Sequence, residues 1–181
     1  MNSKTKFLTF ASLTLAVSSL TVSTVVAQAK LTNQSKLFIN GIGQVRVGMT
    51  VSQAAKAAGT QLVGDPPNNS CYYVKPQNEP KNLSFMVTKG RISRVDVRQN
   101  TQITTLKGAK IGDTEAQIKS LYAGQIQVTP HKYVQGGHNL TFVPKDRANQ
   151  NYRVVFETDG KRVTQFHSGK LPEVEFVEGC S

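Results

Sequence analysis

Two similar stretches of sequence, VGMTVSQA at Val47–Ala54 and IGDTEAQI at Ile111–Ile118, decide the fold that this chain predicts. In each stretch a threonine is followed three residues later by a glutamine. That spacing is typical of a capping box, in which the threonine side chain accepts from a free backbone N–H and the glutamine bonds back to the threonine backbone. We therefore expect one helix to begin directly after each threonine.

The residues that follow each threonine have the period of a short helix with one buried face. We expect helices at about 51–58 and 115–122, with an apolar stripe on each. Gly59 and Gly124 stand where a left-handed C-terminal cap belongs. The apolar residues of the two stripes are Val51, Ala54, Ala55, Ala58, Ile118, Leu121 and Tyr122.

Beyond each helix the apolar period changes to two, which indicates strands. Lys89-Gly90 and Asp159-Gly160 predict hairpin turns between them. The expected strands cover residues 71–74, 83–87, 92–97, 125–128, 139–143, 153–157 and 162–166.

The order of these elements predicts the fold class and the domain organisation. We expect an α+β fold, built as a tandem repeat of a short helix packed on an antiparallel β-sheet. The first repeat would cover residues 30–100 and the second residues 101–181, and both would form one compact unit. Chance agreement between two ordinary helix-hairpin segments is the alternative, and the shared order of glycine, cap, helix and hairpin favours duplication.

The N-terminal segment 1–29 predicts a cleaved signal peptide. Lys4 and Lys6 precede a run of apolar residues, which ends in the small-x-small sequence Ala27-Gln28-Ala29. The alternative, a membrane anchor, needs about 20 mostly apolar residues, and eight serines and threonines interrupt this run. We therefore expect a secreted or periplasmic protein with no transmembrane segment in the mature chain.

The part of the chain that we expect to be exported has a positive net charge and two cysteines. Only Lys4 and Lys6 of the 22 cations precede residue 30, so 20 cations against 11 anions leave a net charge of +9. Such a charge favours weak attraction to anionic surfaces. Cys71 and Cys180 form an even pair in an oxidising compartment, which predicts a disulfide rather than a catalytic thiol.

A capped helix start followed by a small antiparallel sheet, present twice, resembles the β-lactamase-inhibitor-protein fold. It also resembles the small outer-membrane assembly lipoproteins, and exported bacterial proteins that end in Glu-Gly-Cys, here Glu178-Gly179-Cys180. The resemblance implies a sheet that offers a concave face to another protein, without naming a target. The chain departs from the inhibitors in having no tryptophan, and from the lipoproteins in having no lipidated cysteine.

A search for catalytic residues yields no constellation. His131, His138 and His167 lack the spacing of zinc ligands. Asp96 stands within a strand, and the acidic residues Glu173, Glu175 and Glu178 are typical of a solvated tail rather than of a paired-carboxylate hydrolase. We predict no catalytic, metal or cofactor-binding residues.

The remaining features predict a binding protein. The basic residues of the hairpin at 89–98 face both sides of a strand and lack the aromatic platforms of nucleic-acid binders, so we expect no nucleic-acid partner. The leading hypothesis is an exported, non-enzymatic module that binds an unknown protein, with a possible binding face near Tyr73, Tyr133 and Phe142. The alternative is a cell-envelope structural protein that associates with anionic surface polymers by charge.

Overall fold

The computed structural model describes residues 30–64 and 70–180. The predicted signal peptide at 1–29 lies outside these residues. The described part contains two α-helices, α1 (Val51–Ala58) and α2 (Glu115–Leu121), and two 3-10 helices, η1 (Arg147–Asn149) and η2 (Glu173–Glu175). Its strands are β1 (Lys36–Phe38), β2 (Gly41–Ile42), β3 (Val45–Arg46), β4 (Leu62–Gly64), β5 (Cys71–Pro76), β6 (Leu83–Thr88), β7 (Arg91–Arg98), β8 (Thr104–Thr105), β9 (Ile126–Pro130), β10 (His138–Phe142), β11 (Tyr152–Thr158) and β12 (Val163–Lys170).

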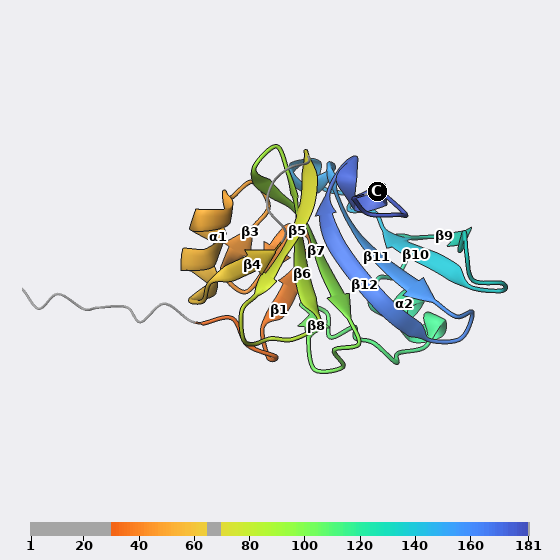
Figure 1. Ribbon diagram of the computed structural model, residues 1–181. Helices are drawn as coiled ribbons and strands as arrows, with labels where there is room; N and C mark the ends of the chain where they lie inside the picture. The colour runs from red at the N-terminus through yellow and green to blue at the C-terminus, as the bar shows by residue number, and fades with distance from the viewer. Residues whose placement is uncertain (1–29, 65–69, 181) are drawn as a thin grey trace, which may run out of the picture.

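The strands form two sheets of unequal size. The larger has eight strands in the order β4-β5-β6-β7-β12-β11-β10-β9, and every neighbouring pair is antiparallel. Figure 1 shows these strands spread from β4, beside α1, to β9 at the opposite edge. The smaller sheet has the order β3-β2-β1-β8, and β8 pairs with β1 in parallel. Strands from both sides of residue 100 therefore meet in the small sheet.

The helix starts form as the sequence predicts. The Thr50 hydroxyl accepts from the backbone N–H of Gln53 at 3.2 Å, and the Gln53 side chain accepts from the Thr50 N–H at 2.9 Å. Thr114 and Gln117 make the same two hydrogen bonds at 3.2 and 2.7 Å. These bonds satisfy backbone donors that the first helical turn leaves free.

The helix ends differ from each other. Gly59 caps α1 in the left-handed conformation, with φ of 64°. In α2 the cap is Tyr122, and Gly124, which the sequence suggested for that place, adopts positive φ two residues further on. The prediction of a glycine cap is therefore confirmed for the first helix and wrong for the second.

The predicted α+β fold class is wrong, because the structure is mostly β. The helices are short, with eight and seven residues, and do not define two helix-on-sheet repeats. The sequence places the hairpins, but their assembly differs: β7 pairs directly with β12, with Val97 opposite Phe166, so the hairpins join one continuous sheet. The cause lies in long-range pairing, which local periodicity does not encode.

The hydrophobic core covers one face of the large sheet. Phe85, Phe156 and Phe166 are fully buried there, because side chains alternate between the two faces of a strand. Leu37 and Ile42 of the small sheet belong to the same core. We call this the inner face, and the opposite face the outer face. The outer face is therefore free to hold polar side chains.

Candidate functional site

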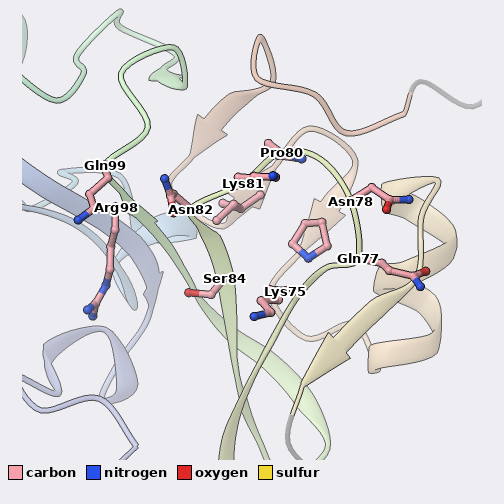
Figure 2. A pocket seen from close by; sticks show the side chains of 11 residues that line it. Lys75, Gln77, Asn78, Pro80, Lys81, Asn82, Ser84, Arg98 and Gln99 are labelled. Atoms are coloured by element: carbon pink, nitrogen blue, oxygen red, sulfur yellow. The ribbon is translucent and has the colours of Figure 1, made fainter.

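One cavity lies at the end of the large sheet where β5, β6 and β7 meet their connecting segments, and Figure 2 shows its lining. Its volume is about 480 Å³. We call it the basic cleft. The residues that line it are Lys75, Pro76, Gln77, Asn78, Pro80, Lys81, Asn82, Leu83, Ser84, Arg98 and Gln99.

Strand pairing brings these residues together from three elements. Lys75 stands at the end of β5, Ser84 at the beginning of β6, and Arg98 at the end of β7. The backbone N–H of Arg98 donates to the carbonyl of Asn82 at 3.0 Å, which joins the end of β7 to the connection before β6. One end of the sheet and the 77–82 connection thus form the two walls of the cleft.

Hydrogen bonds hold the 77–82 connection in place. The Asn100 side chain, which is buried, donates to the Lys81 carbonyl at 3.0 Å and to the Asn33 side chain at 2.7 Å. The Glu79 carboxylate accepts from the backbone N–H of Lys81 at 3.0 Å. A wall fixed in this way loses little conformational freedom when a ligand binds.

Two cleft residues have an uncommon backbone conformation. Asn82 has φ of 59° and Gln99 has φ of 51°, both in the left-handed region, which asparagine adopts more readily than most residues and glutamine rarely adopts. Both stand where the chain enters or leaves a strand. Such conformations cost free energy, and they concentrate at functional sites.

The cleft combines cations with neutral hydrogen-bonding groups. Lys75, Lys81 and Arg98 are exposed, and none of them forms an ion pair with a carboxylate in the described part of the chain. The other polar lining residues supply amides and one hydroxyl, and the lining contains neither aspartate nor glutamate. The chemistry of this set matches an anion, which accepts hydrogen bonds from ammonium, guanidinium and amide donors.

The three residues of the predicted binding face lie elsewhere. Tyr73 is half-buried on the outer face, where its hydroxyl accepts from Arg94 at 2.8 Å, and burial raises its pKa. Tyr133, in the β9–β10 connection, is 60% exposed and its hydroxyl donates to Glu178. Phe142 packs against Tyr122, with 4.8 Å between ring centroids, in contact with the core. The structure brings Tyr73 and Tyr133 to the same C-terminal segment and leaves Phe142 on the other face.

The C-terminal segment 171–180 crosses the outer face. Arg94 donates to the carbonyls of Glu173 and Phe176, at 3.3 and 2.8 Å, and the Thr88 hydroxyl donates to the Glu173 carboxylate at 2.7 Å. The predicted disulfide between Cys71 and Cys180 is confirmed, with 5.3 Å between the Cα atoms. This bond ties the segment to the first residue of β5.

The three histidines each contact one carboxylate. His131 and His167 lie 3.0 and 3.5 Å from Glu157, and His138 lies 2.8 Å from Glu115. Within residues 30–64 and 70–180, no group of three or more histidine, cysteine or acidic side chains has a geometry that could hold a metal ion.

The sequence pattern did not predict the basic cleft. The segment Lys75–Asn82 reads KPQNEPKN, a connection rich in lysine, amide side chains and proline, and this composition was the available signal. The cleft forms only because strand pairing brings this segment next to Arg98 and Gln99, which are more than fifteen residues away in sequence.

Comparisons with protein families, with curated proteins and with solved structures found no match for this chain. The family resemblance drawn from the sequence therefore stays a prediction. In the described part of the chain, no helix has the length and apolar character needed to cross a membrane.

Proposed function

We propose that this chain is an exported, non-enzymatic binding protein whose basic cleft binds anionic groups of a cell-envelope polymer. The observation that supports the proposal is the lining of the cleft: three cations that pair with no carboxylate of the described residues, together with amide donors, and a lining without aspartate or glutamate. Phosphodiester and carboxylate polymers share the chemistry that such a lining recognises.

Two observations support an extracytoplasmic location within this proposal. The segment 1–29 has the sequence features of a signal peptide. The disulfide between Cys71 and Cys180 is of a kind that persists in oxidising compartments and is rare in the cytosol.

A binding titration tests the proposal. The purified mature protein is titrated with polyphosphate and, separately, with polygalacturonate, at about 50 mM salt. We expect the double variant Lys81→Gln/Arg98→Gln to bind at least about ten-fold more weakly, because it removes two cations of the cleft. The wild-type affinity should also fall steeply toward a few hundred millimolar salt, since screening weakens exposed charge pairs.

A matched variant separates the cleft from total charge. Lys56→Gln/Arg147→Gln removes the same two charges at exposed positions that do not line the cleft. It should retain nearly all of the wild-type affinity. If both double variants lose affinity equally, the attraction is a property of net charge and the cleft is not the site.

A second candidate function, binding of a protein, is supported by a different part of the surface. Tyr133, Val134, Phe176 and Val177 are large apolar residues with 40 to 60% of their surface exposed, and they belong to the β9–β10 connection and the C-terminal segment. Exposed apolar groups of this kind often mark protein contacts. Capture of a partner that survives high salt and the cleft substitutions would favour this candidate over the polymer.

A further inference from the structure

A second cavity, of about 260 Å³, lies on the outer face between β9–β12 and the C-terminal segment. We call it the acidic cavity, because its lining includes Glu157 and Glu175 and contains neither lysine nor arginine. Phe176 and Val177, which are 40 and 55% exposed, also line it. Its charge is thus opposite to that of the basic cleft, and its residues are different.

Glu157 is the central charged group of this cavity. One of its oxygens, Oε2, accepts from the His131 Nε2 at 3.0 Å and from the Gln165 side chain at 2.5 Å. The His131 Nδ1 accepts from the backbone N–H groups of Tyr133 and Val134, so its ring proton must be on Nε2. Burial opposes the ionisation of Glu157, but the hydrogen bond from Gln165, the charge that His167 carries at acidic pH and the hydrogen bond from His131 hold its pKa below the ordinary value, so the group is a carboxylate at neutral pH.

The other oxygen of Glu157 faces an acceptor. Oε1 lies 3.5 Å from the Nδ1 of His167, whereas the Nε2 of that ring donates to the Val174 carbonyl at 2.9 Å. Burial, and then the nearby Arg94, lower the pKa of His167, while Asp96 and Glu157 oppose this shift. A neutral His167 with its proton on Nε2 has a lone pair on Nδ1. At neutral pH two acceptors therefore face each other, and no side chain of the described residues donates to either of them.

A third acceptor lies on the next strand. Asn139 is directly opposite Glu157 in the β10–β11 register, and its Oδ1 is buried without a hydrogen-bond partner in the described part of the chain. Buried polar atoms in proteins nearly always have a partner, and leaving one unpaired costs free energy. Around the Glu157 carboxylate the cavity thus has three acceptor atoms, Glu157 Oε1, His167 Nδ1 and Asn139 Oδ1, to which no donor of the described residues forms a hydrogen bond.

We propose that the acidic cavity binds a primary ammonium group carried on a flexible chain. An ammonium group has one positive charge and three N–H donors, which matches the carboxylate and the three unpaired acceptors. The methylenes of such a ligand would leave the cavity past Phe176 and Val177, whose exposed apolar side chains can contact them. A lysine side chain and a free diamine share this chemistry.

Calorimetric titration of the wild-type protein with four small probes tests the proposal. The probes are Nα-acetyl-lysine amide, its Nε-trimethylated form, 1,5-diaminopentane and 1-pentanol. We expect the two primary amines to bind, and the trimethylated form to bind at least about ten-fold more weakly, because it keeps the charge and loses all three N–H donors. A stronger response to the lysine derivative indicates a peptide source, and a stronger response to the diamine a free amine.

An Asn139 variant distinguishes a role of this side chain in ligand binding from a purely structural role. Asn139→Leu removes the unpaired acceptor, so we expect ammonium binding to fall at least about ten-fold while the unfolding temperature stays equal or rises. The basic-cleft variant Lys81→Gln/Arg98→Gln should bind the amines as the wild type does, which separates this inference from the proposed function. Equal binding of the primary and trimethylated amines, or no binding of either primary amine at about 10 mM, would overturn the proposal.

Discussion

Arg94 shows how one buried residue organises the outer face. Its guanidinium contacts both oxygens of Asp96, at 3.0 and 2.8 Å, and also donates to Tyr73 and to two carbonyls of the C-terminal segment. The side chains of Arg94 and Asp96 are only 3% exposed. A buried ion pair of this kind adds little net stability, because both charges lose their hydration. Here the pair serves to position the C-terminal segment, because the N–H donors of Arg94 hold that segment against the sheet.

His167 gives a prediction on pH at the same scale. Burial, with Arg94 adding to it, lowers the pKa of His167 below the ordinary value of 6.5, so the unfolded chain binds this proton more readily than the native state. Its contribution to stability is therefore complete above pH 6.5 and is lost as the pH falls below that value.

Denaturant unfolding at pH 7.5, 6.5 and 5.5 measures this effect. The free energy of unfolding of the wild type should fall on acidification over that range, and in His167→Gln the fall should be smaller. Glu157, whose pKa is lowered from 4.5, loses its contribution in a more acidic range and does not obscure the comparison. Parallel pH profiles of the two proteins would show that His167 does not titrate as we describe.

At the scale of elements, local sequence patterns predicted most of the helices and strands but not how the strands pair. The helix at 51–58 and the seven strands that the sequence indicates are present, because capping and alternation are local properties. The strands β1, β2, β3, β4 and β8 were not predicted, since runs of two or three residues are too short to show a period. The pairing of β7 with β12, which changes the fold class, depends on contacts between residues about seventy positions apart.

The disulfide could likewise be predicted from local information, whereas the two cavities could not. The disulfide could be predicted from the cysteine count and the compartment alone. The basic cleft needs Lys75, Ser84 and Arg98 on three strands at one end of the sheet, and the acidic cavity needs Asn139 opposite Glu157. Such arrangements require the strand register, which the sequence pattern does not determine.

The two capping boxes give a prediction for the helices. Replacing Thr50 or Thr114 by alanine removes the acceptor for an N–H of the first turn, so each variant should lower the free energy of unfolding by about 1 kcal/mol. Thr101→Ala is the control, because Thr101 is exposed and lies outside both helices. Chemical denaturation of the three variants measures the difference, and a control that loses as much stability as the cap variants would contradict the capping role.

At the scale of the whole molecule, the large sheet separates the core from the two cavities. The inner face holds the apolar core, the outer face holds the acidic cavity, and the basic cleft lies at one end of the sheet. Gln165 pairs with Arg98 on one side and with Glu157 on the other, so one residue of each cavity belongs to a single row across the sheet. Two strand spacings, about 10 Å, separate their backbone positions. The basic cleft and the acidic cavity are therefore neighbours on one sheet.

The disulfide gives the prediction for the whole chain. It joins residues 109 positions apart, and removing a crosslink of that span typically costs 2 to 5 kcal/mol, roughly, in a small domain. We expect Cys180→Ser to lose stability in that range, as measured by urea unfolding without reductant. Dithiothreitol should lower the wild type to the level of the variant and leave the variant unchanged. A wild type whose stability does not respond to complete reduction would contradict the prediction.

The same covalent bond gives the chain an unusual connectivity. Residues 71–180 form a closed ring of covalent bonds, with the N-terminal part attached to it at a single residue. A protease that cuts the exposed connection between β10 and β11 opens the ring and releases no fragment. The nicked protein then keeps its full mass under oxidising conditions, and the two pieces separate only after reduction. The ring therefore allows the chain to tolerate a first cut in this connection without losing either half of its large sheet.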